Sequence, residues 1–369
     1  MKKIDLVIDA RMITENLHGI ARYTYEIIKY ISKQKEFNLY VLVNDEEMFY
    51  KIFGEKINVK LIKMKSKFLS LYEQIELPLI LNKLGGNFIF HTPSFCSSPF
   101  IKIKTLMTIH DLNHLRYPQY YSWMHKYYYD YIVKPSAKKS EIILTVSEFS
   151  KKEILEWLSI DENKVISIYN GVDENFKKIN DLELLNKIKQ KYDLPEKFVL
   201  YIGNQKPHKN VETLIKSMQH VNEDICLVLN GKLNERCNKI IVEAKLENRI
   251  KFIGYVEEID LPYLYNLASV FVYPSYYEGF GLPPLEAMAC GCPTLVSNVT
   301  SLPEVVGNEE MTFNPYDERD IGYKINNILS DNDFRRNIIN YGLNRAREFS
   351  WYNICKQIID VYKKVDYVK

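Results

Sequence analysis

The 369-residue sequence predicts an α/β protein made of two doubly wound domains. Short apolar runs alternate with amphipathic stretches in both halves of the chain, which is typical of parallel sheets covered by helices. Residues 173–197 are charged and helical in pattern with no strand signal, and the chain exceeds the usual size of a single core. We therefore expect a first domain over residues 1–175 and a second over residues 176–350.

The first domain is expected to contain six strands. They are the apolar runs 4–10, 38–44, 87–92, 105–111, 141–147 and 164–170. The chain starts with basic residues, as a signal peptide does, but Asp5 and Asp9 interrupt the apolar run that follows, so this run is interpreted as the first strand. Ser147 is a candidate N-cap and predicts a helix directly after the fifth strand.

The second domain repeats this pattern. Its expected strands are the runs 198–204, 225–231, 250–256, 270–275, 293–297 and 311–314. Ligands of doubly wound sheets bind outside the carboxyl ends of the strands, so two facing domains would place a site in the cleft between them. The last stretch, residues 351–369, has apolar groups at close to helical spacing and predicts a helix with one face to bury.

The amino-acid composition argues against a membrane-spanning protein and against a nucleic-acid-binding protein. Hydrophobic residues make up 46% and charged residues 26% of the chain, as in ordinary soluble proteins, and no apolar run is long enough to span a bilayer. A net charge of +2 and the absence of a recognition motif argue against a nucleic-acid partner. The six cysteines lack metal-type spacing, which favours reduced thiols in the cytoplasm.

The stretch 278–293, EGFGLPPLEAMACGCP, predicts an anion-binding turn. An apolar strand precedes it, and Gly279 and Gly281 allow backbone amides to approach a ligand closely. Two prolines suit the first turn of a following helix, whereas Gly291 suits its left-handed end. A diphosphate lying across Phe280, Gly281 and Leu282 would be held by oriented N–H groups at a helix start that carries about half a positive charge.

Two acids flank this turn. Glu286 lies one turn inside the expected helix, where its carboxylate can accept hydrogen bonds from vicinal hydroxyls such as those of a ribose. Glu278 lies before the turn and could reach a second polyhydroxy group beyond the phosphates. The bland alternative is a capping acid and a solvated helical acid, but the strand, the glycines and the prolines around them favour a ligand.

The stretch resembles the E-x7-E motif of the GT4 family of retaining glycosyltransferases, with Glu278 and Glu286 at its two glutamates. Six further segments are similar to that family in the same order: GIARYT, TIHDL, TVSEFSK, YNGVD, GNQKPHKN and FSW. The resemblance implies the GT-B fold, in which two Rossmann-like domains face a cleft. It also implies that the last helix, residues 351–369, crosses back to the first domain with Trp351 as an anchor.

The GNQKPHKN segment follows a strand, and the resemblance implies a donor-binding role for Gly203, Asn204, Lys206 and Lys209. Lys209 should meet the diphosphate, because a fixed ammonium stabilises the charge that develops on a leaving nucleoside diphosphate. Family members often carry Arg after the glycine, whereas this chain has Asn204. Lys206 or a neutral hydrogen bond from Asn204 would have to substitute for the missing charge.

Two positions in the first domain complete the expected site. Gly19 resembles the glycine of the family's N-terminal loop, which approaches the donor phosphates, although an ordinary turn before a helix explains it nearly as well. His110 ends an apolar run, and the resemblance implies that it approaches the transferred sugar and the acceptor. With Lys209 and Glu278, His110 forms the expected catalytic set.

The resemblance implies a hexosyltransferase that moves a hexose from a nucleotide sugar to a hydroxyl of a surface-glycan or lipid-linked saccharide. Mannose from GDP-mannose is the first expectation, since the motif segments are similar to polysaccharide mannosyl- and rhamnosyltransferases, and UDP- or dTDP-hexoses are further candidates. No cofactor or metal is expected. The alternatives are a nucleotide-sugar epimerase of related fold and a catalytically inactive GT-B binding subunit. The change at Asn204 gives the inactive subunit a little support, whereas the presence of Lys209, Glu278, Glu286 and His110 argues against it.

Two segments mix aromatic or aliphatic residues with lysines, as interfacial membrane segments do: residues 61–72, LIKMKSKFLSLY, and residues 117–131, YPQYYSWMHKYYYDY. They are equally compatible with helices that pack their tyrosines on their own domain and solvate their lysines. The sequence thus predicts a cytoplasmic protein and leaves peripheral contact with an anionic inner membrane face as an open hypothesis.

Overall fold

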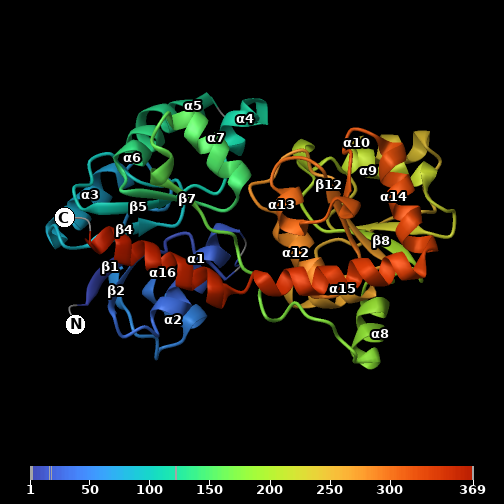
Figure 1. Ribbon diagram of the computed structural model, residues 1–369, viewed down its shortest axis with the longest axis horizontal. Coiled ribbons are helices and arrows are strands. Elements are labelled where there is room, and N and C mark those ends of the chain that lie inside the picture. Colours follow the sequence, from blue (N-terminus) through green and yellow to red (C-terminus); the bar gives the residue numbers. More distant parts are fainter. Residues whose placement is uncertain (1–2, 16, 18, 121–122, 368–369) are drawn as a thin grey trace. The chain divides into compact units, whose positions relative to one another are not determined.

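A computed structural model describes residues 3–15, 17, 19–120 and 123–367 of the chain. The chain divides into two compact units (Figure 1): unit 1 contains Met1–Asn170 and Trp351–Lys369, and unit 2 contains Gly171–Ser350. The division after Asn170 lies slightly before residue 175, where the change in sequence pattern suggested a boundary. Both units are α/β folds with parallel sheets, which confirms the predicted fold class.

Unit 1 contains a seven-stranded parallel sheet in the order β3-β2-β1-β4-β5-β6-β7. Its strands are β1 (Ile4–Asp9), β2 (Phe37–Val43), β3 (Lys60–Lys63), β4 (Ile89–Thr92), β5 (Lys104–Thr108), β6 (Ile142–Thr145) and β7 (Val165–Ser167). Six of them match the expected runs. β3 was not predicted, because an edge strand with lysines at both ends and one paired side gives no continuous apolar run.

The helices of unit 1 connect these strands, except the last one, which follows unit 2 in the sequence. They are α1 (Ile20–Ile31), α2 (Glu46–Phe53), α3 (Glu73–Leu84), α4 (Asn113–Arg116), η1 (Pro118–Tyr120), α5 (Trp123–Tyr128), η2 (Tyr129–Val133), α6 (Lys134–Lys139), α7 (Glu148–Leu158), η3 (Glu162–Lys164) and α16 (Trp351–Tyr367). The predicted N-cap is present at α7, where the Ser147 hydroxyl accepts a hydrogen bond of 3.0 Å from the Ser150 amide.

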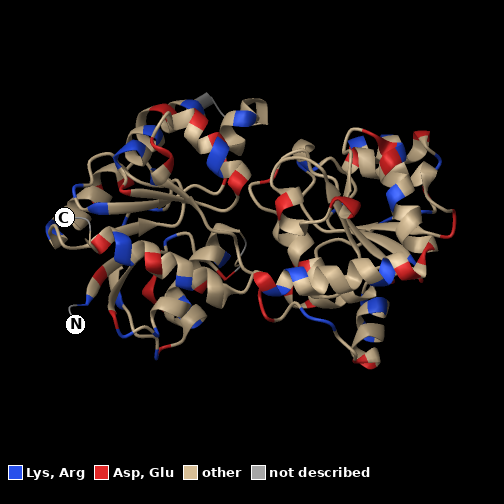
Figure 2. Ribbon diagram, viewed as in Figure 1, with Lys and Arg blue, Asp and Glu red and all other residues tan. Residues whose placement is uncertain are grey.

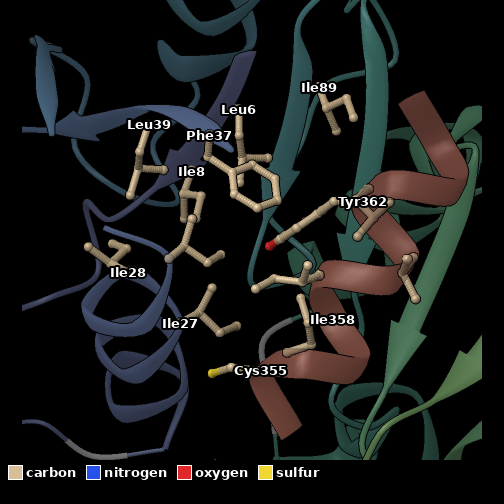
Figure 3. Close-up of a cluster of buried hydrophobic side chains, with 14 of the residues drawn as sticks. Leu6, Ile8, Ile27, Ile28, Phe37, Leu39, Ile89, Cys355, Ile358 and Tyr362 are labelled. Carbon is tan, nitrogen blue, oxygen red and sulfur yellow. The ribbon is translucent and has the colours of Figure 1, made fainter. Parts of the chain in front are cut away.

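Helix α16 completes the core of unit 1. Its inward face is Ile354, Cys355, Ile358, Ile359, Val361, Tyr362 and Val365. These side chains pack against the apolar residues of β1, β2 and α1 (Figure 3), so the last segment of the chain packs on the first unit, as predicted. The buried Tyr362 hydroxyl also lies 2.6 Å from His91 Nδ1 on β4, which fixes the helix against the sheet.

Unit 2 contains a six-stranded parallel sheet in the order β10-β9-β8-β11-β12-β13. Its strands are β8 (Phe198–Tyr201), β9 (Cys226–Leu229), β10 (Ile250–Phe252), β11 (Val270–Tyr273), β12 (Thr294–Ser297) and β13 (Thr312–Phe313). All six match expected runs. The central strands are buried along their whole length, as expected of a parallel sheet with helices on both faces.

Its longer helices are α8 (Leu182–Lys191), α9 (Val211–Ser217), α10 (Glu235–Glu243), α11 (Leu261–Leu267), α12 (Leu282–Ala289), α13 (Leu302–Val306), α14 (Glu318–Ser330) and α15 (Asn332–Glu348). Short 3-10 turns lie at η4 (Pro207–Lys209), η5 (Met218–His220), η6 (Glu258–Asp260) and η7 (Glu309–Met311). In each unit the chain reverses its order in the sheet once, between β1 and β4 and between β8 and β11. Such switch points are where doubly wound folds bind ligands.

The surface carries both charge signs. Figure 2 shows Lys and Arg interspersed with Asp and Glu over the helices of both units. Among the described residues, no helix combines the length and the apolar composition that crossing a bilayer requires.

We predict that Ile358→Ala lowers the free energy of unfolding by about 2–5 kcal/mol, because Ile358 is fully buried between α16 and the sheet and its truncation leaves a cavity. Urea denaturation measures this change. The neighbouring exposed Gln357→Ala should change stability by less than about 0.5 kcal/mol. Equal effects of the two substitutions would contradict the assigned packing of α16.

Candidate active site

The expected site residues of unit 2 lie at the carboxyl ends of β8 and β11, the two strands that flank its switch point. Gly203 follows β8, and Lys209 ends the short turn η4 that leads into α9. Glu278 follows β11, and Gly281 immediately precedes α12. Because parallel strands end at the same edge of the sheet, these segments from distant parts of the sequence lie close together.

Lys209 and Glu278 form an ion pair. The Lys209 Nζ atom lies 2.6 Å from Glu278 Oε1 and donates to the Tyr273 hydroxyl at 3.1 Å, and each charged side chain is only 12% exposed. Low exposure strengthens this attraction relative to a surface pair. Asn210, at φ 57° just after η4, fixes the lysine's backbone by donating to the Pro274 and Pro315 carbonyl oxygens at 3.0 and 2.8 Å.

Hydrogen bonds to the segment before α13 fix the turn between β11 and α12. The buried Ser301 hydroxyl lies 2.9 Å from both the Glu278 and the Phe280 carbonyl oxygens, and the Thr300 hydroxyl accepts from the Glu278 amide at 3.3 Å. Thr300 has a φ of 58°, an uncommon conformation for a β-branched residue. Backbone strain at Thr300 therefore accompanies the placement of Glu278.

Gly281 is the N-cap of α12 and cannot be replaced freely. Its φ is 112°, and an added Cβ would lie 2.6 Å from Leu302 Cδ2. The helix begins at Leu282 with proline in its first turn and is followed by Gly291 at φ 73°, as predicted. The Phe280 side chain is buried and packs near Phe349, so only its backbone can serve a ligand.

Glu286 is oriented by a buried tyrosine. The Tyr265 hydroxyl donates to Glu286 Oε2 at 3.0 Å, and burial raises the pKa of Tyr265 well above its ordinary value. Tyr265 therefore remains a donor at neutral pH. Because Glu286 is partly exposed, its carboxylate can accept further hydrogen bonds from a ligand.

A hydrogen bond and close side-chain packing also restrict the loop after β8. The Gly203 amide donates to Asn230 Oδ1 at 2.8 Å, and an added Cβ would lie 2.6 Å from the Tyr201 hydroxyl. The Asn204 side chain accepts from the Lys206 amide at 3.1 Å, which makes it part of a local turn. Asn204 and Lys206 are exposed, whereas the Lys209 side chain is only 12% exposed in its ion pair with Glu278.

In unit 1, Gly19 is the exposed N-cap of α1 with a φ of 53°. His110 lies beyond the carboxyl end of β5, where its Nε2 atom lies 2.9 Å from the Pro93 carbonyl oxygen. A carbonyl can only accept, so Nε2 carries the proton, and no described residue hydrogen-bonds to Nδ1. Burial lowers the pKa of His110 to about 4, so a neutral ring with Nδ1 as an acceptor exists at neutral pH.

A chain of buried groups supports the His110 ring. The Tyr23 ring packs edge-on against His110 with centroids 4.9 Å apart, and the Tyr23 hydroxyl lies 3.4 Å from Thr108 Oγ1. Thr108 Oγ1 in turn lies 2.8 Å from His91 Nε2, and His91 bonds Tyr362 through its other nitrogen. Through these contacts the C-terminal helix α16 is linked to the residues that pack around His110 in unit 1.

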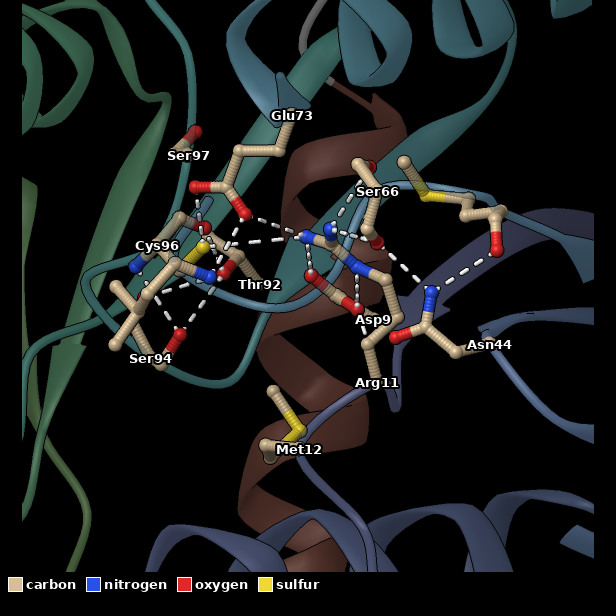
Figure 4. A network of polar contacts seen from close by, with 12 residues as sticks. Asp9, Arg11, Met12, Asn44, Ser66, Glu73, Thr92, Ser94, Cys96 and Ser97 are labelled. Carbon is tan, nitrogen blue, oxygen red and sulfur yellow. Dashed lines mark hydrogen bonds and ion pairs between the residues drawn. The ribbon is translucent and has the colours of Figure 1, made fainter. Parts of the chain in front are cut away.

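A second polar cluster occupies the switch point of unit 1 (Figure 4). Arg11 bonds Asp9 at 2.7 Å and lies 3.3 Å from Glu73 Oε2, and all three side chains are buried. Burial raises the pKa of Glu73, and the Cys96 thiol donates to its Oε1 at 2.9 Å. This cluster was not predicted, because Asp9 and Glu73 are far apart in sequence and neither belongs to a motif.

Tyr273, Tyr265, Ser301 and Thr300 were also not predicted. Each acts by holding a predicted residue, and only Tyr273, as the last residue of a strand before the motif, had a signal in the sequence.

Comparison with known sequences identifies the family. Residues 17–176 match the family described as Glycosyltransferase Family 4, and residues 185–345 match that described as Glycosyl transferases group 1. The chain is 35% identical over 285 residues to O-antigen chain mannosyltransferase B of Escherichia coli, an alignment that covers 75% of this chain and 74% of that protein. This chain belongs to glycosyltransferase family 4.

Another relative of this family 4 glycosyltransferase is the serotype-specific mannosyltransferase WbdA of Escherichia coli. It is 34% identical over 273 residues, which are 71% of this chain but 34% of WbdA. Among solved structures, the glycosyltransferase from Rickettsia africae ESF-5 matches with a TM-score of 0.77, 20% identity and 100% of both chains. Anabaena Alr3699/HepE in complex with UDP and glucose matches with a TM-score of 0.77, 16% identity, and 98% and 100% of the two chains.

These neighbours are GT-B glycosyltransferases, and the GT-B fold of this chain is confirmed by the likeness. Among the described residues of the glycosyltransferase, no group of three or more His, Cys, Asp or Glu side chains is arranged to hold a metal ion.

We predict that this glycosyltransferase loses stability on acidification through His91. Burial lowers the pKa of His91 from 6.5 to about 3. Between these values the unfolded chain binds a proton that the folded protein does not, so the free energy of unfolding falls as pH decreases. The loss should reach about 2 kcal/mol between pH 6.5 and about pH 5.

Urea denaturation of His91→Gln should show a weaker dependence on pH than the native protein, because the other titrating groups are common to both. The partly exposed His220→Gln serves as the control and should keep the native dependence. If the native protein and His91→Gln lost stability in parallel, the neutral buried state of His91 would be refuted.

Proposed function

We propose that this glycosyltransferase is a retaining mannosyltransferase that moves mannose from GDP-mannose to a hydroxyl of a surface-glycan or lipid-linked saccharide. The observation that carries the proposal is the Lys209–Glu278 pair, held at 2.6 Å beside the turn that starts α12. A fixed cation and a glycine-capped helix start suit the phosphates of a nucleotide sugar, and a fixed carboxylate suits its hydroxyl groups.

The diphosphate is assigned to the start of α12 and to Lys209. The amides of the first helical turn have no partner within the helix, and proline near the start removes only a donor that the helix does not use. As the sugar–phosphate bond breaks, negative charge grows on the departing oxygen. Lys209, already fixed by Glu278 and Tyr273, would stabilise that charge with little reorganisation.

The two glutamates are assigned to hydroxyl groups on either side of the phosphates. Glu278 shares only one carboxylate oxygen with Lys209, so the other can accept from a sugar hydroxyl. Glu286, oriented by Tyr265, would accept from the ribose. Gly203, Asn204 and Lys206 would contribute backbone or weaker side-chain contacts to the same donor.

Unit 1 would supply the remaining groups. Gly19 would contribute the start of α1 to donor binding. Nδ1 of His110 would accept a hydrogen bond from a hydroxyl group of the transferred sugar or of the acceptor. A low histidine pKa makes His110 a weak base, so the departing phosphate oxygen is the better proton acceptor for the attacking hydroxyl.

The choice of mannose rests on relatives named O-antigen chain mannosyltransferase B and mannosyltransferase WbdA. A nucleoside diphosphate sugar as donor is supported by a structural neighbour described as a complex with UDP and glucose. The direct experiment incubates the protein with GDP-, UDP- and dTDP-sugars and a saccharide acceptor, and analyses the products. Transfer from GDP-mannose with retained configuration is expected, and exclusive use of another donor would refute this choice.

Two incubations separate the alternatives. A nucleotide-sugar epimerase converts the donor even without acceptor, whereas an inactive binding subunit retains nucleotide affinity but gives no product with acceptor present. The pairing of Lys209 with Glu278 favours an active transferase over an inactive subunit, since it keeps two charged side chains in place at only 12% exposure.

We predict that Lys209→Ala lowers kcat about 10²–10³-fold, because the charge on the leaving diphosphate loses its fixed cation. Steady-state kinetics with saturating donor measure the effect. Lys216→Ala, which removes an exposed lysine from α9, should retain native kinetics. Native turnover in Lys209→Ala would contradict the assigned role of the lysine.

We predict that transfer does not require a divalent metal, since Lys209 and the amides of α12 would supply the positive charge at the phosphates. Rates with excess EDTA should equal those with added Mg²⁺. Activity that disappears in EDTA and returns with Mg²⁺ would show that a cation is needed.

A lipid-linked acceptor would require the enzyme to work at a membrane surface. We therefore extend the proposal to a cytoplasmic protein in peripheral contact with the anionic inner face of the membrane.

A further inference from the structure

We propose that the outer face of α3 and the adjoining loop at Phe100 form the surface by which unit 1 docks on an anionic lipid bilayer. The inference deepens the proposed function, because it assigns residues to the membrane contact of the enzyme. It arises from a helix that is apolar on two opposite faces although only one of them is covered by unit 1.

The inner face of α3 belongs to the core, where Leu77 and Leu81 are fully buried. The outer face carries Leu71, just before the helix, then Ile75 and Leu79, with exposed fractions of 84%, 60% and 57%. The spacing of four residues aligns these three side chains in one row along the helix, and Lys83 continues it. A surface helix normally places polar residues on this face, so its apolar row indicates a partner.

The loop before β5 extends the apolar surface. The Phe100 ring is 65% exposed, yet its backbone is held rigidly, since Asn82 of α3 donates to the Phe100 carbonyl at 3.1 Å and accepts from the Lys102 amide at 2.8 Å. Ile75, Leu79 and Phe100 line a groove of about 620 Å³ together with Lys83, Lys102 and Lys139. An ordered, exposed aromatic ring beside aliphatic side chains is well suited to insertion at a bilayer interface.

The positive charge around this groove indicates an anionic partner. The groove is bordered by three lysines and by no acid. The two acids of α3 are turned elsewhere: Glu73 is buried in the cluster with Arg11, and Glu76 accepts from the Lys65 and Ser66 amides at 3.0 and 2.6 Å. Apolar side chains framed by lysines match the boundary between acyl chains and anionic headgroups.

The position of the lysines argues for a bilayer rather than for the phosphate of an acceptor. Lys83, Lys102 and Lys139 precede β4, β5 and β6, so they lie at the amino edge of the parallel sheet. His110 lies at the opposite, carboxyl edge. A bilayer against α3 would leave that carboxyl edge open to an acceptor anchored in the same membrane.

The sequence pointed to neighbouring segments. The run 61–72 begins within the edge strand β3, and Met64 is buried, so this part of the run is structural, whereas its exposed Leu71 belongs to the proposed surface. The segment 117–131, apart from residues 121 and 122, which lie outside the described residues, carries a second exposed line at Met124, Tyr127 and Tyr131. Tyr128 joins it to α3 by donating to Glu73 at 3.3 Å.

The test is flotation of the full-length protein with vesicles of equimolar phosphatidylglycerol and phosphatidylcholine, compared with vesicles of phosphatidylcholine alone. The protein should float with the anionic vesicles and be released by high salt. The double variant Ile75→Glu/Leu79→Glu should lower the bound fraction about tenfold or more, and Lys83→Glu/Lys102→Glu should lower it similarly. Ile259→Glu, at a 74% exposed isoleucine of unit 2, should bind as the native protein does.

Since Ile75 and Leu79 are exposed, the double variant should unfold at the native temperature and transfer sugar to a water-soluble acceptor at the native rate. Its transfer to a vesicle-bound acceptor should fall with binding. Failure of the native protein to float, or equal loss in Ile259→Glu, would overturn the proposal. A native dimer that the double variant dissociates would assign this face to a second copy instead. Vesicle binding without any sugar transfer would refute the proposed function and leave the docking surface intact.

Discussion

Parallel strand pairing is the constraint on which the rest of this structure depends. Every pairing between named strands of the two sheets is parallel, so each connection must cross back over its sheet before the next strand begins. All turns that lead out of strands consequently collect at one edge. Segments that are unrelated in sequence, such as those carrying Lys209 and Glu278, meet there, and so do Arg11 and Glu73 in unit 1.

At both switch points a cation with little or no exposure is paired with carboxylate, but the number of carboxylates differs. Lys209 faces one carboxylate and keeps a small exposed fraction, so a ligand can join the pair. Arg11 lies between two carboxylates and is closed off from solvent. Although burial opposes its charged form, the adjacent Asp9 raises the pKa of Arg11, which keeps it charged at all relevant pH values. The first arrangement suits binding, whereas the second suits attachment of α3 to the sheet.

The sequence predicted the features that depend on local pattern. Twelve apolar runs became strands, Ser147 caps α7, and Gly281 and Gly291 delimit α12 with positive φ angles. It did not predict groups whose role depends on tertiary contact. Ser301 and Tyr265 hold the acidic motif from other elements, and β3 has too little apolar character because its outer edge needs no partner. The outward apolar row of α3 was likewise not predicted, because the sequence of an apolar helix does not show which of its faces is buried.

Helix α16 has a consequence for biosynthesis. The strands of unit 1 emerge from the ribosome first, but Tyr362 and its neighbours, which fill the space between α1 and the sheet, are made only after all of unit 2. Unit 2 is contiguous and can fold as soon as it is synthesised, whereas unit 1 must wait with an uncovered apolar surface. The half of the enzyme that is translated first is therefore the last to reach its native state, and chaperones that shield nascent chains would find their binding surface there.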